Sequence, residues 1–128
     1  SEIAESFLKF IEDKKIKVHK VVCVVDCGVA VNPDIVRGQM EGGIVFALTA
    51  ALKGNISVVD GAVQQSNFHN YELLRMNETP EIEVHILESA EAPTGVGEPG
   101  VPPLAPALAN AVYAASGQRL RQLPLKLV

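Results

Sequence analysis

The feature that most constrains the fold is a helix start at Asn32-Pro33-Asp34. Asn32 can accept hydrogen bonds from free backbone N–H groups, proline suits the first helical turn, and aspartate favours the positive end of the helix dipole. Apolar residues then recur along one helix face, which is typical of burial: Val36, Met40, Ile44, Val45, Leu48 and Leu52. Gly54-Asn55 ends the pattern, so we predict a helix from Asn32 to about Leu52.

Three glycines lie inside this predicted helix, at Gly38, Gly42 and Gly43. A glycine in a helix interior costs about 1 kcal/mol relative to alanine. Three such costs within two turns predict that something packs very close to this face. The pattern leaves open whether that partner is a strand of the same chain or a bound cofactor.

The N-terminal region favours two strands. Residues Lys15–Val25 alternate polar and apolar side chains before becoming wholly apolar, which predicts a strand. Phe7–Ile11 also fits a strand, although a helix over Ile3–Ile11 is a competing interpretation. Cys23 and Cys27 would be about 13 Å apart on such a strand. A disulfide needs Cα atoms within about 7 Å, so we predict two reduced core thiols.

The middle of the chain predicts a hairpin and a further strand. Ile56–Gln65 surrounds Asp60-Gly61, a dipeptide that suits a type I′ turn. Tyr71–Leu74 is a candidate for a short strand in a polar, irregular segment. Glu81–Ser89 alternates cleanly between apolar and polar side chains and predicts a half-buried strand.

A second helix is predicted over Leu104–Ala115 and ends at Gly117. It is apolar nearly all round, so we expect it to be buried. The expected fold class is therefore α+β, with mixed strands and hairpins packed against two helices. The 128 residues are enough for a single domain, 1–128.

Charge and hydrophobicity exclude some functions. The net charge is −4, and the only lysine run, Lys14 to Lys20, is interpreted as the solvated face of a strand, so nucleic-acid binding is not expected. No apolar run is long enough to predict a membrane span. The hydrophobic share of 48% suggests that some apolar surface meets another polypeptide. The three histidines are scattered, and no metal ligands are predicted.

The segment Gly95–Gly100 displays one acid, Glu98. Gly97 can take dihedral angles closed to other residues, and Pro99 pushes Glu98 toward extended geometry. Glu98 is then either an exposed acid in a turn or a general base or acid in a pocket. Gln39 has the same ambiguity. It is either a surface glutamine or an amide that both donates to and accepts from a ligand.

Three motifs in order support a family resemblance: Val25–Pro33 (VDCGVAVNP), Gly38–Gly43 (GQMEGG) and Gly95–Pro99 (GVGEP). Together they resemble the C-terminal part of the large, molybdenum-binding subunit of the xanthine dehydrogenase/aldehyde oxidase family. The isoquinoline 1-oxidoreductase beta branch is the most similar, because Gln64–His69 and Arg75–Glu78 also look like that branch.

The resemblance implies an activity and a site. Members hydroxylate N-heterocycles or aldehydes with water-derived oxygen, using a molybdenum–pterin cofactor that we expect in its dinucleotide form. The residue matching Glu98 is the general base. The glutamine matching Gln39 contacts the cofactor near the metal, and the loop matching Gly95, Val96 and Gly97 lies against it. The substrate within these classes is not fixed by the chain.

The resemblance also implies partners, namely the remainder of the molybdenum subunit and an iron–sulfur small subunit. Family subunits are several times longer than this chain, and other cofactor-contacting loops lie upstream. We therefore expect the isolated chain not to turn over substrate. The alternative is a non-catalytic folded fragment or binding module that holds no molybdenum cofactor on its own. A cytoplasmic location is expected, with the periplasm as the alternative.

Overall fold

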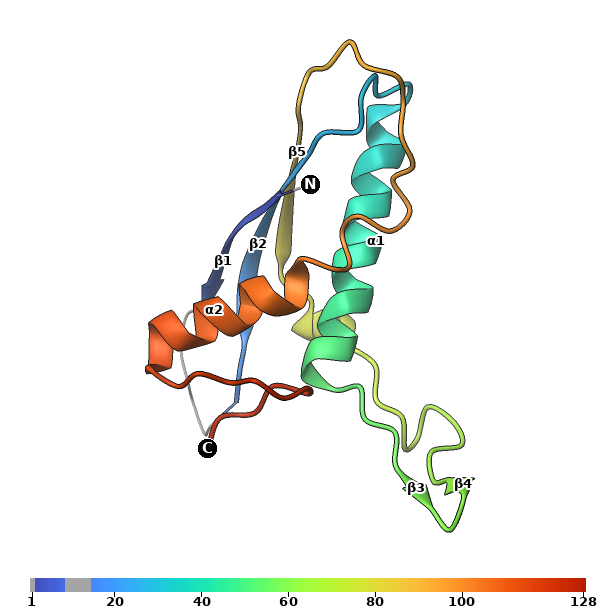
Figure 1. The fold of residues 1–128 in the computed structure, drawn as a ribbon, viewed down its shortest axis with the longest axis vertical. Helices are drawn as coiled ribbons and strands as arrows, with labels where there is room; N and C mark the ends of the chain where they lie inside the picture. Colours follow the sequence, from blue (N-terminus) through green and yellow to red (C-terminus); the bar gives the residue numbers. More distant parts are fainter. Residues whose placement is uncertain (1, 9–14) are drawn as a thin grey trace.

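A computed structural model describes residues 2–8 and 15–128. Strands β1 (Glu2–Leu8), β2 (Val18–Val25) and β5 (Glu81–Ile86) form one sheet in the order β1-β2-β5 (Figure 1). β1 runs antiparallel to β2, and β5 runs parallel to it. A parallel pair needs a long crossover connection, and helix α1 (Pro33–Leu52) lies in that connection. The observed class is α+β, as predicted.

Helix α1 begins where its sequence predicts. The Asn32 side-chain oxygen accepts a hydrogen bond from Ile35 N at 3.2 Å, so it caps the helix as expected. At the other end, the Lys53 N–H donates to the Thr49 carbonyl. The predicted apolar stripe supplies most of its buried residues, which include Val36, Met40, Ile44 and Leu48.

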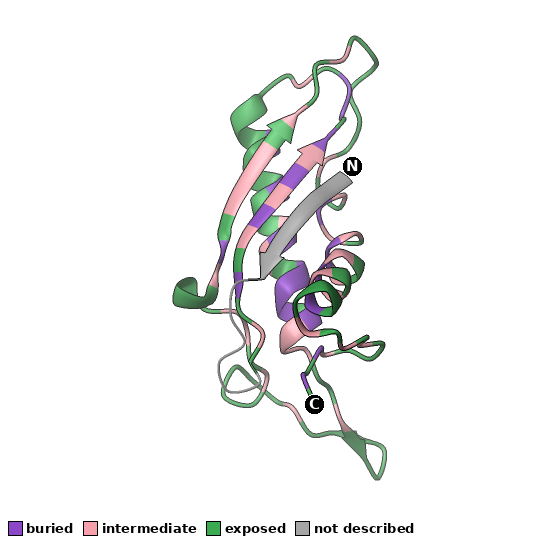
Figure 2. Cartoon of the chain, turned by 90° about the vertical axis from the view of Figure 1, so that its left-hand side faces the viewer, coloured by how far each residue is buried: buried purple, intermediate pink, exposed green. Residues whose placement is uncertain are grey.

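Helix α2 (Leu104–Ser116) packs against β1, and α1 packs against β5, so both helices cover one face of the sheet (Figures 1 and 2). The core lies between the sheet and the two helices. Its fully buried side chains are Val21, Cys23, Val25, Met40, Ile44, Leu48, Leu104, Leu108 and Val112. Both cysteines are buried and free, which confirms the predicted reduced thiols. Burial raises the pKa of the Cys23 thiol.

The prediction that the second helix is buried all round is wrong. In α2 one stripe, Leu104, Leu108 and Val112, is buried, while residues 113–115 are exposed. Alanine-rich helices look apolar on every face, but a two-layer fold covers only the face that meets the core. Gly117 ends the helix in a left-handed conformation with φ of 72°, as predicted.

A hairpin formed by β3 (Val58–Val59) and β4 (Ala62–Val63) projects away from the body (Figure 1). Asp60 and Gly61 both have positive φ, 50° and 78°, which confirms the predicted primed turn. We call residues 54–71 the arm. Hydrogen bonds between the Gln65 side chain and Ser57 brace it internally.

Three local predictions need correction. The chain forms strand β1 where an N-terminal helix was the alternative, so that helix is wrong over Ile3–Leu8, and its remainder, like most of the predicted strand Phe7–Ile11, lies outside the described residues. The next strand begins at Val18, later than predicted. No strand forms over residues 71–74, because Leu74 N donates to the Thr49 hydroxyl at 3.2 Å and a 3₁₀ turn, η1 (Met76–Glu78), follows.

Helix α1 also meets the length and mean hydropathy, 1.2, of a membrane span, which the sequence reading did not predict. Its apolar face is occupied, however, because Met40, Ile44 and Leu48 are buried against the sheet and α2. Charged residues such as Arg37 and Glu41 lie on its solvent-exposed face. We interpret α1 as the core helix of this fold.

Candidate functional site

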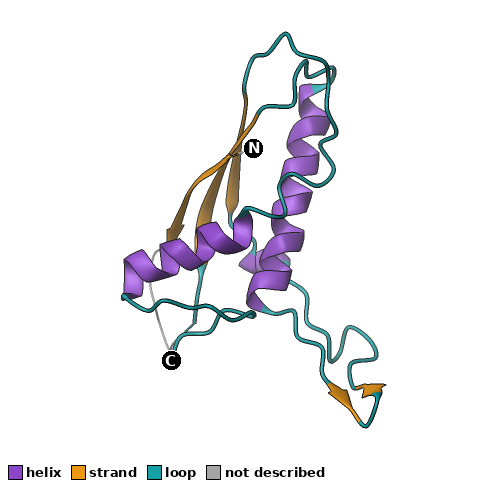
Figure 3. Cartoon of the chain, in the orientation of Figure 1, coloured by secondary structure: helices purple, strands orange, loops and turns teal. Residues whose placement is uncertain are grey.

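Glu98 lies in the long loop between β5 and α2, which we call the Glu98 loop and define as residues 87–103. The loop runs beside α1 before it enters α2 (Figures 1 and 3). Glu98 is exposed, and its carbonyl accepts a hydrogen bond from Val101 N at 2.9 Å, which closes a turn. The acid is therefore presented by a folded turn on the surface of the described chain.

The loop sits directly on the backbone of α1 at Gly100. A Cβ atom at Gly100 would lie 3.2 Å from the Met40 carbonyl oxygen and 3.6 Å from the Met40 Cα. Gly43 faces the loop from the helix side, where a Cβ would meet Gly100 and Val101 at 3.5–3.7 Å. The close approach favours glycine at position 100, whereas a Cβ at Gly43 would be in ordinary van der Waals contact. The contact at Gly100 places Glu98 two residues from a fixed point.

Gln39 lies one helical turn before Gly43, on the same face of α1. That face meets the Glu98 loop through Gly43. The Gln39 side chain is exposed and makes no hydrogen bond within the described residues. The fold thus brings the two candidate residues to the same side of the helix, although the sequence separates them by 59 positions (98 − 39).

Close packing was expected at all three glycines of α1, but only Gly43 has it. A Cβ at Gly38 or Gly42 would meet nothing within 4 Å. These two glycines instead line a shallow groove of about 450 Å³ with Thr79, Pro80 and Ile82. The prediction of close packing is thus wrong for Gly38 and Gly42 within the described chain, because the start of β5 and the residues before it leave this groove between themselves and the helix.

The segment Gly95–Gly97 is open on its outer side. A Cβ at Gly95 or Gly97 would have nothing within 4 Å. Across the described part of the chain, no acceptor is bonded to the N–H groups of residues 95–98. Four consecutive backbone donors beside an unobstructed surface can therefore bind acceptor atoms of a ligand, with Gln39 adding a side-chain amide.

The turn after β2, residues 26–29, holds the start of the Glu98 loop, a role that no local sequence pattern predicts. Val29 N donates to the Glu91 carbonyl at 3.0 Å, and Thr94 N donates to the Cys27 carbonyl at 2.9 Å. The available signal was Gly28, a glycine between a strand and a helix start. Its tight contact with the loop depends on chain segments that are far apart in sequence.

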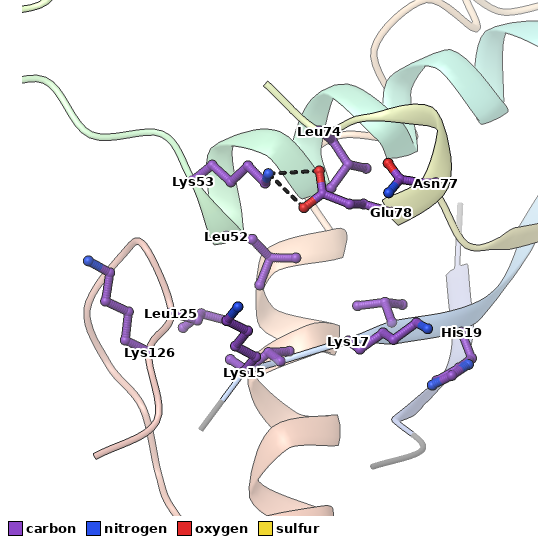
Figure 4. A pocket seen from close by; sticks show the side chains of 12 residues that line it. Lys15, Lys17, His19, Leu52, Lys53, Leu74, Asn77, Glu78, Leu125 and Lys126 are labelled. Atoms are coloured by element: carbon purple, nitrogen blue, oxygen red, sulfur yellow. Dashed lines mark hydrogen bonds and ion pairs between the residues drawn. The ribbon is translucent and has the colours of Figure 1, made fainter. Parts of the chain in front are cut away.

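A larger cavity, about 690 Å³, lies elsewhere, at the C-terminal end of α1 (Figure 4). It is bordered by Lys15, Lys17 and Lys126, together with an apolar floor that includes Leu52 and Leu125. Among the described residues that line it, the one carboxylate is that of Glu78, which is paired with Lys53 Nζ at 2.7 Å. No residue of the Glu98 loop lines this cavity, so size alone does not locate the candidate base.

Charged groups on the sheet form a separate network. Glu83 contacts both Lys20 Nζ and His85 Nε2 on the exposed surface of β2 and β5. The Lys20 hydrogen bond, followed by that of His85, lowers the pKa of Glu83. Among the described residues, no three His, Cys, Asp or Glu side chains gather as metal ligands.

Comparisons with known proteins agree on one family. The family profile "Molybdopterin cofactor-binding domain" matches residues 11–80. The chain is 43% identical over 114 residues to isoquinoline 1-oxidoreductase subunit beta of Brevundimonas diminuta, covering 89% of this chain and 15% of that protein. It is 31% identical to the xanthine dehydrogenase molybdenum-binding subunit of Escherichia coli O157:H7, covering 87% of this chain and 16% of the relative.

Solved structures give the same result. Quinoline 2-oxidoreductase from Pseudomonas putida 86 superposes with a TM-score of 0.75 at 26% identity, covering 86% of this chain and 15% of that one. CO dehydrogenase from Oligotropha carboxidovorans gives 0.74 at 27% identity, with 85% and 15% covered. The chain thus spans roughly one seventh of the length of these relatives. It belongs to the molybdopterin cofactor-binding domain family and corresponds to a portion of a molybdenum hydroxylase of the xanthine dehydrogenase/aldehyde oxidoreductase type.

Proposed function

We propose that this chain supplies the general base, Glu98, to a molybdenum hydroxylase that oxidises N-heterocycles or aldehydes with water-derived oxygen. The observation that carries the proposal is the placement of Glu98 in a turn that rests on the α1 backbone through Gly100. A base must be held within hydrogen-bond reach of the proton it takes, and a loop anchored to a helix meets that need. Glu98 would accept the proton of the attacking water-derived nucleophile on its carboxylate.

The residues around Glu98 fit one face of a molybdenum–pterin cofactor in its dinucleotide form. Gly95 and Gly97 leave space for a large planar group against the backbone, and the N–H groups of residues 95–98 are available to its acceptor atoms. The Gln39 amide can donate to an oxygen and accept from an N–H at the same surface. When bound, the cofactor supplies the two-electron oxidation of the substrate, which no side chain of this chain can perform.

Residues of this chain would then have separate tasks. Gly95, Val96 and Gly97 would hold the cofactor through their backbone, because a side chain at either glycine would fill the open surface. Gln39 would orient it from the helix side. Glu98 would handle the proton, and its exposure in this chain fits a position that the remainder of the molybdenum subunit covers.

Apolar surface on the described chain supports the proposed partners, namely that remainder and an iron–sulfur small subunit. Ile35 and Phe46 on the outer side of α1 are 60% and 70% exposed. The arm exposes further apolar side chains: Ile56, Val58, Val59, Val63 and Phe68. A single small domain rarely leaves so many large apolar residues in water, so we expect these surfaces to be buried in the assembled enzyme.

The decisive experiment replaces Glu98 by Gln in the holoenzyme that contains this chain. Turnover should fall by about 10²–10⁴-fold, because the amide cannot accept the proton, while molybdenum and pterin contents stay unchanged. Glu91→Gln is the matched control, since Glu91 is an exposed acid of the same loop with no side-chain bond within the described residues. Normal turnover in Glu98→Gln would remove Glu98 from the base role. If the native assembly that contains this chain is purified and holds no molybdenum, the alternative is favoured, namely a folded portion that holds no cofactor.

A further inference from the structure

The turn at residues 26–29, which follows β2, is bonded to the Glu98 loop along much of that loop's first half. Leu87 N donates to the Val25 carbonyl at 2.9 Å, Val29 N to the Glu91 carbonyl at 3.0 Å, and Thr94 N to the Cys27 carbonyl at 2.9 Å. The turn and the loop are joined by backbone groups alone, so the attachment does not depend on flexible side chains.

Gly28 lies at the centre of this attachment. Its φ is +68°, in the left-handed region, and a Cβ atom there would lie 2.2 Å from the Ala92 carbonyl oxygen and 2.8 Å from the Glu91 carbonyl oxygen. Real Cβ atoms essentially never approach backbone so closely, and neither neighbour is the end of a flexible side chain. The loop therefore occupies the volume that any side chain at position 28 would need.

Asp26 holds the turn in the required shape. Its Oδ1 accepts a hydrogen bond from Gly28 N at 3.1 Å, which is a local turn of the kind that aspartate favours. The Asp26 side chain is exposed at the end of β2. Asparagine would retain an acceptor oxygen at this position, whereas alanine would remove it.

The attachment at Thr94 and the contact of Gly100 with α1 bracket Glu98. Thr94 is four residues before Glu98, and Gly100 is two residues after it. Between these two points the backbone N–H groups of residues 95–98 make no bond within the described residues. The location of Glu98 is consequently set by its two flanking attachments.

We infer that the Asp26–Val29 turn, through Gly28, is the positioning element of the Glu98 loop. Gly28 and Asp26 are positioning residues, because they act on Glu98 through the loop backbone. The structural part of this inference is independent of the chemistry. Its catalytic consequence rests on the proposed base role of Glu98.

The test is Gly28→Ala in the holoenzyme, read by hydrogen exchange and by steady-state kinetics. Amides in residues 87–94 should exchange at least about tenfold faster, because the bonds donated by Leu87 N and Thr94 N are displaced. Turnover should fall by about a hundredfold, with little change in KM and unchanged molybdenum content, since a base displaced by about 1 Å loses that much.

Gly117→Ala is the matched control. Gly117 has a similar left-handed backbone, with φ of +72°, but a Cβ there would meet nothing within 4 Å, and it follows α2, outside the arm and the Glu98 loop. Both variants place alanine at a positive φ, and only Gly28→Ala adds the collision with the loop. Gly117→Ala should leave exchange in residues 87–94 and turnover unchanged. Equal exchange in the two variants would overturn the inference.

Asp26→Ala keeps the test decisive if Gly28→Ala does not assemble. Asp26→Ala should raise exchange in residues 87–94 and lower turnover, and Asp26→Asn should restore both; failure of either expectation overturns the inference. Faster exchange with normal turnover, in an enzyme that Glu98→Gln inactivates, also overturns the positioning role. Normal turnover in Glu98→Gln instead overturns the proposed function, and the exchange data still decide the structural part.

Discussion

The Glu98 loop and the arm are both long connections between core elements, yet they are fixed in different ways. The loop is bonded to the β2 turn at Val29 and Thr94 and rests on α1 at Gly100. The arm is braced mainly by its own side chains and projects from the body (Figure 1). Internal hydrogen bonds can fix the conformation of a segment, but only contacts with the core fix its position relative to the rest of the molecule. A catalytic group needs a fixed position, which supports the loop as the candidate site.

Met40→Ala should have the largest effect on stability, because it empties a fully buried position of the core next to the contact between the loop and α1. The backbone carbonyl of Met40, which lies against Gly100, is retained. Deleting such a side chain costs about 2–5 kcal/mol in the free energy of unfolding. Urea unfolding measures the loss, and hydrogen exchange should rise at Val101, whose N–H is bonded to the Glu98 carbonyl, but not in the arm.

Phe46→Ala provides the contrast, because Phe46 is on the same helix but 70% exposed. It should change the free energy of unfolding by no more than about 0.5 kcal/mol. A loss at Phe46 equal to that at Met40 would show that the outer side of α1 is covered in the measured species.

Gly100→Ala tests the contact between loop and helix directly. Its Cβ would come within 3.2 Å of a backbone oxygen that cannot move independently of α1. Overpacking of this kind costs about 1–3 kcal/mol, which a shift of the urea midpoint would report. Gly97→Ala, whose Cβ meets nothing within 4 Å, should leave stability unchanged or slightly raised. Equal losses of stability in Gly100→Ala and Gly97→Ala would contradict the conclusion that the loop contacts α1 closely at Gly100 and not at Gly97.

Glu78→Gln should have a small effect and concerns the base of the arm, where the Glu78 carboxylate accepts a hydrogen bond from Lys53 Nζ at 2.7 Å. That bond, followed by the Arg75 N–H, lowers the pKa of Glu78 below its ordinary value of 4.5. The ionised form therefore stabilises the fold above that value, and the contribution disappears as pH falls through the lowered pKa. Because the side chain is 39% exposed, the loss at pH 7 is about 0.5 kcal/mol.

Unfolding of wild type and Glu78→Gln at pH 7 and at about pH 3 measures this dependence, and the difference should vanish at the lower pH. Glu72→Gln is the control, since its carboxylate lies 4.0 Å from the same lysine and is 74% exposed. A stability difference for Glu78→Gln that grows in acid would refute the assigned direction.

Local signals predicted the elements that local chemistry controls. The Asn32 cap, the apolar stripe of α1, the Asp60-Gly61 turn and the strand at β5 are all read from residues within a few positions of one another. Predictions that needed a distant partner were less accurate. The predicted strand near Leu74 does not form because the Leu74 N–H donates to Thr49 on α1. Helix α2 was expected to be buried on faces that no described residue covers.

For the candidate site, the sequence by itself supplied Glu98, Gln39 and the glycine-rich segment, because residue type and motif order are properties of the chain. Only the tertiary structure decided that Gln39 and the loop share one side of α1, that Gly38 and Gly42 are open, and that Gly28 excludes every side chain. The reason is physical. Propensity and periodicity act over a few residues, whereas the position of a loop is set by contacts between segments that only the folded chain brings together.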